Sequence, residues 1–165
     1  MNSLLIDLAA LVGAKLKQAH WMISTAESCT GGLVAAALTE TSGSSLYFDR
    51  GFITYSNLAK QQMLGVPETM LHRYGAVSEE VARAMAQGAL RHSAAHLSLA
   101  ITGIAGPGGG TAEKPVGTVC FGWALTQPHS PAVMEQTQWF AGNRKAVREA
   151  AAAYALRGVL KLLQY

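Results

Sequence analysis

The stretch LSLAIT, residues 97–102, decides the fold class of this sequence. It is a continuous, largely apolar run of strand length, and a glycine-rich loop follows it directly. Such a run is typical of a central strand buried on both faces, because a half-buried strand would alternate apolar and polar side chains. A strand of this kind needs helices on both faces of its sheet. We therefore expect a protein of the α/β class.

Helix and strand patterns alternate on the N-terminal side of this run. Apolar runs predict strands at residues 21–26 and 51–55. Helical spacing and helix-ending residues predict four helices, within residues 1–20, 31–41, 58–64 and 79–92. Ser3 and Ser78 are the expected N-caps of the first and last of these helices, and Gly65 with Pro67 ends the third.

Two consecutive strands are predicted on the C-terminal side, at residues 116–125 and 133–140. Only the short segment 126–132, which begins TQPHSP, separates them, so at least one antiparallel pairing is expected. A long helix rich in alanine and leucine follows at residues 144–163, with Asn143 as its N-cap. The predicted fold is therefore an α/β three-layer sandwich (α/β/α) with a mixed β-sheet, formed by one domain of residues 1–165.

Composition narrows the function classes. Half of the 165 residues are hydrophobic and 14% are charged, as in a globular chain with a substantial core. The net charge of +3 is spread along the chain, and no basic aromatic patch or nucleic-acid module is recognisable, so a nucleic-acid partner is not expected. A small phosphorylated ligand would suit this charge.

The cysteines and the first helix indicate the compartment. Cys29 and Cys120 are far apart and form no disulfide framework or zinc pattern, which favours the cytoplasm. Asp7, Lys15 and Lys17 interrupt the apolar run of the first helix, so it is neither a signal peptide nor a membrane span.

The histidines do not predict a metal site. His20, His72 and His129 stand alone, whereas His92 and His96 are four residues apart. That spacing could hold a metal in principle, but no carboxylate or third ligand stands beside the pair. We interpret the pair as the solvated end of a helix, and we expect no metal and no other cofactor.

Three segments of unusual composition stand next to predicted strand or helix ends: TAESCTGG at 25–32, GSSLYFDRGFITYSNLAK at 43–60 and TGIAGPGGGTAEKP at 102–115. In open α/β sheets such ends converge on a crevice where ligands bind. Residues 25–32 offer helix N–H groups, two hydroxyls and two glycines to an anion or a carbonyl, although Ser28 and Thr30 could simply cap a helix. Cys29 is expected to be buried and inert.

The glycine-rich segment is not a known nucleotide fingerprint. No lysine completes a Walker loop, GPGGG does not match G-x-G-x-x-G, and a strand rather than a helix follows. It could form a flexible pocket wall, with Thr102 at the strand end and Lys114 as a phosphate contact. A solvent-exposed connection is the alternative.

Lys60 stands in the first turn of a predicted helix, where the helix dipole disfavours a cation. In an apolar crevice, desolvation would also favour the neutral amine, which can act as a general base. Tyr55 lies at the end of the preceding strand and could relay a proton to the same volume. A serine with a neutral lysine forms a known nucleophile, but no S-x-x-K motif is present, so the pairing would have to form across the fold. An ordinary surface lysine is the alternative.

The motifs together resemble one family. The segments TAESCTGG, GSSLYFDRGFITYSNLAK, GAVSE, GIAGPGGGTAEKPVGTV and GNR occur in the order and approximate spacing of the CinA C-terminal domain family. Stand-alone members of that family are nicotinamide-nucleotide amidases. The resemblance covers nearly the whole chain and implies an α/β/α sandwich, usually oligomeric, without a metal. It also implies hydrolysis of nicotinamide mononucleotide to nicotinate mononucleotide and ammonia, in pyridine-nucleotide recycling.

The resemblance also implies roles for individual residues. It implies Ser45 as the nucleophile, Lys60 as its base and Tyr55 as a proton-relay partner. Ser28 and Ser44 also stand in family motifs, and Ser28 is the first alternative nucleophile. Pocket walls or oxyanion donors would come from Ser28, Thr30, Gly31, Thr102, Gly103 and Gly106. The phosphate would be held by Arg144 and Lys114.

Two other functions stay open at this point. The chain could be a catalytically silent nucleotide-binding or regulatory domain of the same family, or an interaction protein associated with competence. Retention of Ser45, Tyr55 and Lys60 favours the enzyme over the silent domain. Many relatives carry Asp in place of Gly108 and Asn143, so ligand affinity could differ here.

Overall fold

A computed structural model describes residues 1–127 and 132–164 of the chain. Five strands form one sheet in the order β2-β1-β3-β4-β5. Their bounds are Ile23–Glu27 (β1), Phe48–Ile53 (β2), Leu97–Gly103 (β3), Thr118–Leu125 (β4) and Ala132–Trp139 (β5). β1 runs parallel to β2 and β3, whereas β4 is antiparallel to β3 and to β5. The prediction of a mixed sheet with an antiparallel pair is confirmed.

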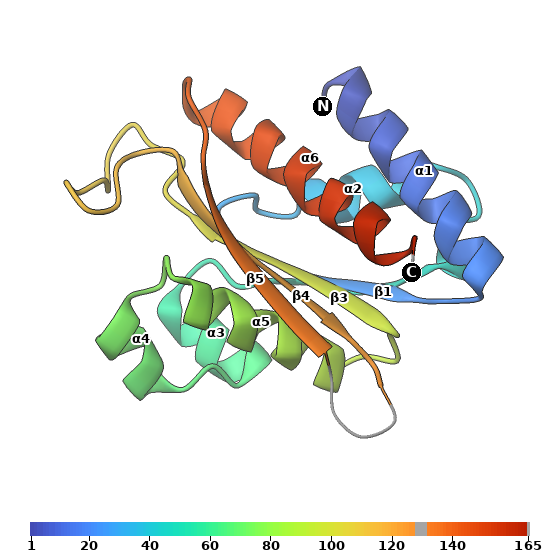
Figure 1. The fold of residues 1–165 in the computed structure, drawn as a ribbon, viewed down its shortest axis with the longest axis horizontal. Coiled ribbons are helices and arrows are strands. Elements are labelled where there is room, and N and C mark those ends of the chain that lie inside the picture. The colour runs from blue at the N-terminus through green and yellow to red at the C-terminus, as the bar shows by residue number, and fades with distance from the viewer. Residues whose placement is uncertain (128–131, 165) are drawn as a thin grey trace.

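Six α-helices in the described part of the chain cover the sheet. They are α1 (Ser3–Ala19), α2 (Leu33–Thr39), α3 (Asn57–Leu64), α4 (Glu68–Tyr74), α5 (Glu79–Arg91) and α6 (Arg144–Leu162), and a 3-10 turn, η1, spans Ser44–Leu46. In Figure 1, α1, α2 and α6 lie on one face of the sheet, and α3, α4 and α5 lie on the other. This arrangement confirms the predicted α/β/α sandwich.

β3 is the middle strand, as the run LSLAIT predicts, and all six of these residues are buried. Its large side chains Leu97, Leu99 and Ile101 belong to the core beneath α1, α2 and α6. Its small side chains face α5. Ala100 belongs to a second core, between the sheet and α5, and the Ser98 hydroxyl donates to the carbonyl of Ala86 at 2.6 Å. The alternation of large and small residues therefore lets α5 lie close to the sheet.

Close packing also fixes α3, the helix that carries Lys60. A Cβ atom on Gly88 of α5 would lie 2.1 Å from the carbonyl oxygen of Leu64 in α3. Only a residue without a side chain allows the two helices to approach this closely. Gly88 thus sets the position of α3 relative to the sheet.

Helix ends agree with the sequence in several places. Ser78 caps α5 and Asn143 caps α6, each accepting a backbone N–H bond from the residue three positions later, and Gly65 ends α3 in the left-handed region. The prediction for α1 was wrong by one residue. Asn2 is the N-cap, because its side chain accepts from the N–H of Leu5 at 2.9 Å, and Ser3 is the first helical residue.

Several element boundaries differ from the predictions. The first two strands were expected at 21–26 and 51–55, but β1 extends to Glu27 and β2 starts three residues earlier and ends before Thr54. The helix expected at 31–41 is shorter at both ends: it starts at Leu33, because Gly31 and Gly32 both have positive φ, and it ends at Thr39. Helix α4 was not predicted. His129 and most of the connection between β4 and β5 lie outside the described residues.

The carboxyl ends of β1, β2 and β3 lie at the same edge of the sheet, because these three strands are parallel. The segments that follow them are the loop before α2, the entry to α3 and the glycine-rich loop. No helix in the described part of the chain is long and apolar enough to cross a membrane.

Candidate active site

A pocket of about 220 Å³ opens at this edge of the sheet. Its lining includes predicted residues from all three loops and from α6: Ser28, Tyr55, Lys60, Thr102, Gly103 and Arg144. The expected convergence of the three loops is therefore present in the structure.

Lys60 is a buried hydrogen-bond donor in the lining of the pocket. Its side chain is only 1% exposed, although it lies in the first turn of α3. The Nζ atom lies 2.9 Å from the carbonyl oxygen of Thr54, to which it donates, and 3.1 Å from the Oγ atom of Ser28. Burial lowers the pKa of Lys60 below its usual value, because desolvation penalises the ammonium form. The alternative of an ordinary surface lysine is excluded.

Ser28 follows the last residue of β1 and is 8% exposed at the pocket wall. Its backbone N–H donates to the carbonyl of Ile101 in β3 at 2.9 Å, which fixes the residue against the central strand. A hydroxyl within hydrogen-bond distance of an amine that favours its neutral form has the geometry of an activated nucleophile.

The loop that carries Ser28 is held from two sides. On one side, the fully buried Glu27 carboxylate accepts from the N–H groups of Val34 and Ala35 at 2.9 and 3.0 Å, so it caps α2. On the other, the Arg148 guanidinium donates to the carbonyls of Cys29 and Thr30, both at 3.0 Å. These bonds fix the backbone of residues 28–32 without contacting Ser28 itself.

Cys29 also lines the pocket, although the residue is buried. Burial raises the pKa of Cys29 to about 12, so the thiol stays protonated at neutral pH. The expectation of a buried Cys29 is confirmed, and its low reactivity stays a prediction.

Tyr55 and Arg144 form the opposite side of the pocket. The guanidinium of Arg144 donates to the Tyr55 hydroxyl oxygen at 2.7 Å and to the carbonyl of Gly106 at 2.9 Å. One arginine at the start of α6 thus joins the segment after β2 to the glycine-rich loop. Tyr55 itself is mostly exposed and accessible to a ligand.

The structure does not bring Ser45 or Ser44 to Lys60. Both lie in η1, before β2 begins, whereas Lys60 follows the end of β2. A strand rises about 3.3 Å per residue, so the two ends of the six-residue β2 are separated by roughly 17 Å. The serine that contacts Lys60 is Ser28, and the expectation that Ser45 would do so is corrected here.

The other expected binding residues have different surroundings. Thr30 is fully buried, Gly31 lies outside the pocket lining, and Gly106 contributes the carbonyl that Arg144 binds. The hydroxyl of Thr102 donates to the Ala76 carbonyl at 2.8 Å. Lys114 lies in a neighbouring cavity and donates to the carbonyl of Tyr74 at 2.9 Å.

Two residues that hold the site were not predicted from the sequence. The sequence motifs assign no role to either Glu27 or Arg148. The one sequence signal for Arg148 is that it lies four residues after Arg144, on the same helix face. Glu27 precedes the first residue of α2 by six positions, so no local capping pattern marks it.

No group of three or more metal-binding side chains occurs within residues 1–127 and 132–164. His92 ends α5 with its Nδ1 atom 2.8 Å from the Gly88 carbonyl oxygen. His96 instead accepts from the backbone N–H of Met22 and stacks on Trp21.

The sequence matches the model of the CinA C-terminal domain over residues 5–163. The chain belongs to the CinA C-terminal domain family. It is 50% identical to the nicotinamide-nucleotide amidohydrolase PncC of Enterobacter agglomerans, with 94% of this chain and 93% of that protein aligned. It is 49% identical to the PncC protein of Escherichia coli K12, with the same coverage.

Other members of the CinA C-terminal domain family are longer. This chain is 53% identical to a putative competence-damage inducible protein of Symbiobacterium thermophilum. The alignment includes 92% of this chain but only 37% of the Symbiobacterium protein. Among solved structures, a competence/damage inducible protein of Agrobacterium tumefaciens has a TM-score of 0.93 and 43% identity, covering 100% of this chain and 98% of its own.

Proposed function

We propose that this chain hydrolyses the carboxamide of nicotinamide mononucleotide, releasing ammonia and nicotinate mononucleotide in the recycling of NAD. The observation that carries the proposal is the buried 3.1 Å contact between Lys60 Nζ and Ser28 Oγ. The names of the amidohydrolase relatives supply the substrate, because the pair by itself would suit several amides.

Ser28 is the nucleophile in this proposal and replaces Ser45. Neutral Lys60 accepts the hydroxyl proton as the Ser28 oxygen attacks the carboxamide carbon, which gives a tetrahedral intermediate and a lysine ammonium. The ammonium then returns the proton to the departing nitrogen, the C–N bond breaks, and ammonia leaves an acyl ester on Ser28.

The oxyanion of that intermediate is assigned to the backbone N–H of Cys29. The Ser28 carbonyl accepts from the N–H of Gly31 at 3.0 Å. In a trans peptide the C=O and N–H point in opposite directions, so the Cys29 N–H points away from Gly31. The Cys29 N–H group has no backbone acceptor within the described residues. The N–H directly after a nucleophile is a recurring oxyanion donor.

A water molecule completes the reaction. Lys60, neutral again after ammonia leaves, takes a proton from water as the water oxygen attacks the ester carbon. Collapse of the second intermediate breaks the ester bond and returns a proton to Ser28. One water is consumed, and the carboxamide becomes a carboxylate. In this scheme Tyr55 lies near the leaving group and relays protons to solvent.

The phosphate of the substrate is assigned to Arg144. This guanidinium has five N–H donors, and in the described part of the chain it donates to only two acceptors, the Tyr55 hydroxyl and the Gly106 carbonyl. Lys114 is less suitable, because its cavity is also lined by the carboxylates of Glu79, Glu80 and Glu113, which repel a phosphate. The 220 Å³ pocket then accommodates the nicotinamide ring, with the phosphate at its mouth.

The experiment is ammonia release from nicotinamide mononucleotide by the purified chain, with a chelator present. Turnover with one ammonia per nicotinate mononucleotide is expected. Thermal stabilisation by the substrate without any turnover would instead favour the silent binding domain. The expected homo-oligomer, the cytoplasmic location and the absence of a metal requirement stay predictions.

A further inference from the structure

A second concave site lies between α6 and the edge strand β5. Its volume is about 660 Å³, within the usual range of about 300–1,000 Å³ for ligand pockets. Its α6 residues lie between Tyr154 and Leu162, whereas Arg144 of the active site is the first residue of that helix. The groove is therefore separate from the catalytic pocket and borders the other half of α6.

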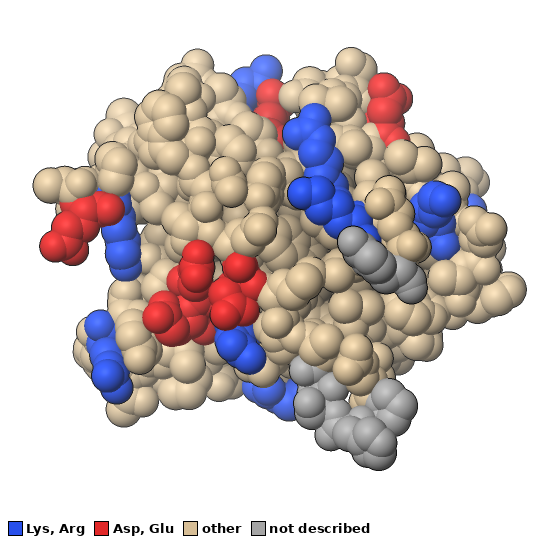
Figure 2. All heavy atoms as spheres, viewed as in Figure 1, with Lys and Arg blue, Asp and Glu red and all other residues tan. Residues whose placement is uncertain are grey.

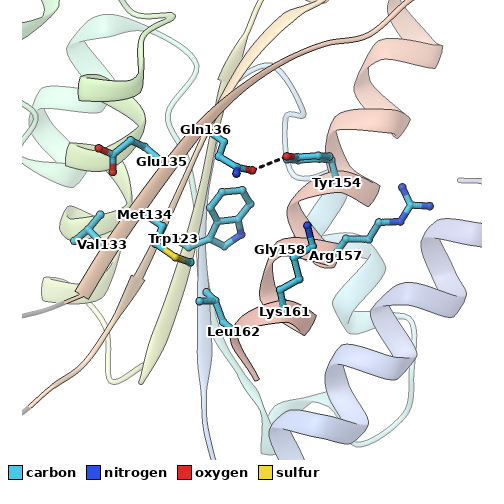
Figure 3. A pocket seen from close by; sticks show the side chains of 10 residues that line it. All are labelled: Trp123, Val133, Met134, Glu135, Gln136, Tyr154, Arg157, Gly158, Lys161 and Leu162. Atoms are coloured by element: carbon cyan, nitrogen blue, oxygen red, sulfur yellow. Dashed lines mark hydrogen bonds between the residues drawn. The ribbon is translucent and has the colours of Figure 1, made fainter. Parts of the chain in front are cut away.

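The floor of the groove is Trp123 of β4, drawn against α6 in Figure 3. Its indole N–H donates to the Ala155 carbonyl at 3.0 Å, and a Cβ atom on Gly158 would lie 2.3 Å from the ring. A glycine inside a helix costs about 1 kcal/mol relative to alanine. Here the glycine is required because the indole packs directly against α6, where Trp123 is only 2% exposed beneath the groove.

β5 forms the second wall. In Figure 3, Met134 lies on the α6 side of this strand, and the Glu135 carboxylate points to the other side. Gln136 accepts from the Tyr154 hydroxyl at 2.6 Å, which ties the strand to the helix. Glu135 pairs with Arg83 of α5 at 3.3 Å. The carboxylate of Glu135 is therefore not available to neutralise the groove.

The α6 wall is positively charged. Arg157 and Lys161 are one turn apart and exposed, and neither forms an ion pair with Asp or Glu in the described part of the chain. Figure 2 shows basic side chains over the C-terminal half of α6, whereas a group of acidic side chains lies over α5 and β5. The groove thus has Lys161 as the cationic group on its α6 wall, whereas the Arg157 side chain points away from Trp123 and Met134 (Figure 3).

We propose that this groove binds an organic anion with a flat apolar body, such as an aromatic carboxylate. The apolar body lies in the groove against Met134, which is 44% exposed, because Trp123 beneath it is only 2% exposed, and the anionic group contacts the ammonium of Lys161. The site does not depend on the amidase reaction. A second copy of the chain pairing along the β5 edge would be a different occupant, and the experiment distinguishes it.

The test is calorimetric titration of the full chain at low salt with 2-naphthoate and with 2-naphthamide. The two probes have nearly the same shape and differ in charge. We expect one naphthoate per chain and affinity for the amide weaker by about tenfold or more. Equal affinity for the two probes, or no binding of naphthoate, would overturn the proposal.

Variants locate the binding. Lys161→Gln should weaken naphthoate binding about tenfold, whereas Lys15→Gln, which removes an exposed cation of α1 outside the groove, should change it less than about twofold. Met134→Glu places a carboxylate in the groove without touching the core and should abolish binding. Unchanged affinity in both groove variants sinks the idea. The proposal would also be overturned if light scattering showed a dimer that Met134→Glu dissociates, because a second copy of the chain would then occupy the groove.

Discussion

At the scale of single residues, the site depends on one lysine that the fold keeps away from water. Lys60 is 1% exposed and gains only neutral partners, the Thr54 carbonyl and the Ser28 hydroxyl. Neutral partners do not offset the loss of ammonium hydration as a carboxylate would, so burial dominates and the pKa of Lys60 falls. The same burial that is unfavourable for the charge makes the amine a usable base.

The pH dependence of kcat/KM follows from this shift. The active form has a neutral Lys60, so activity should rise with pH and level off above the lowered pKa of Lys60. The midpoint should lie below about 10.4, the usual value for a lysine. Initial rates from pH 5 to 10 with buffers of constant ionic strength measure it. A rate that falls through this range as pH increases would exclude Lys60 as the base.

Arg148 is expected to act through the backbone of the loop that it binds. It contacts two carbonyls of residues 28–32 and lies outside the pocket lining, so Arg148→Gln should affect alignment rather than substrate binding. We expect kcat to fall about 10- to 100-fold with KM within about threefold. Arg157→Gln, the same change later in α6, is the matched control for activity and should leave both constants unchanged.

Partial recovery of kcat in a conservative variant would distinguish a positioning role of Arg148 from general damage to the fold. Arg148→Lys keeps a cation that can bind one of the two carbonyls, and its kcat should lie between those of wild type and Arg148→Gln. A rise in KM as large as the fall in kcat would show instead that Arg148 contacts the substrate.

At the scale of elements, the contact between α3 and α5 holds Lys60 in place. Gly88→Ala would put a methyl group 2.1 Å from the Leu64 carbonyl oxygen, so α3 must shift. Overpacking of this kind costs about 1–3 kcal/mol in the free energy of unfolding. Gly108→Ala, where a Cβ meets nothing within 4 Å, is the matched control and should change it by less than about 0.5 kcal/mol. Urea unfolding curves measure both, and equal stability of both variants would contradict this packing.

The elements that the sequence predicted well are those with strong patterns. β3 is buried on both faces, and α5 and α6 have clear N-caps and long runs of helix-forming residues. α4 was missed because only Leu71 of its seven residues is buried, so no apolar stripe marks it. β2 is an edge strand without an alternating burial pattern, which left its start unmarked in the sequence.

At the scale of the whole molecule, sheet topology decides which predicted residues meet. The rule that ligands bind at the carboxyl ends of parallel strands predicted the position of the pocket, with Lys60 and Tyr55 around it, whereas Arg144 of α6 was expected from the family resemblance alone. It also explains the correction at Ser45. The segment 43–60 was treated as one motif, but β2 runs through its middle, so its two ends lie at opposite edges of the sheet. Ser28 follows β1, whose carboxyl end lies at the same edge of the sheet as Lys60.

The partners of the pocket came from elements distant in the sequence. Arg148 reaches the Ser28 loop across 118 residues, and nothing local in the sequence specifies that contact. Long-range hydrogen bonds of this kind depend on how α6 packs over the sheet, which periodicity and capping do not determine.

The most direct test of the account is turnover of nicotinamide mononucleotide by Ser28→Ala and Ser45→Ala, assayed beside wild type with circular dichroism to confirm folding. The Lys60–Ser28 pair predicts that Ser28→Ala loses at least about 10³-fold in kcat, while Ser45→Ala stays within about twofold of wild type. An active Ser28→Ala protein, or an inactive but folded Ser45→Ala protein, would contradict the assignment of Ser28 as the nucleophile.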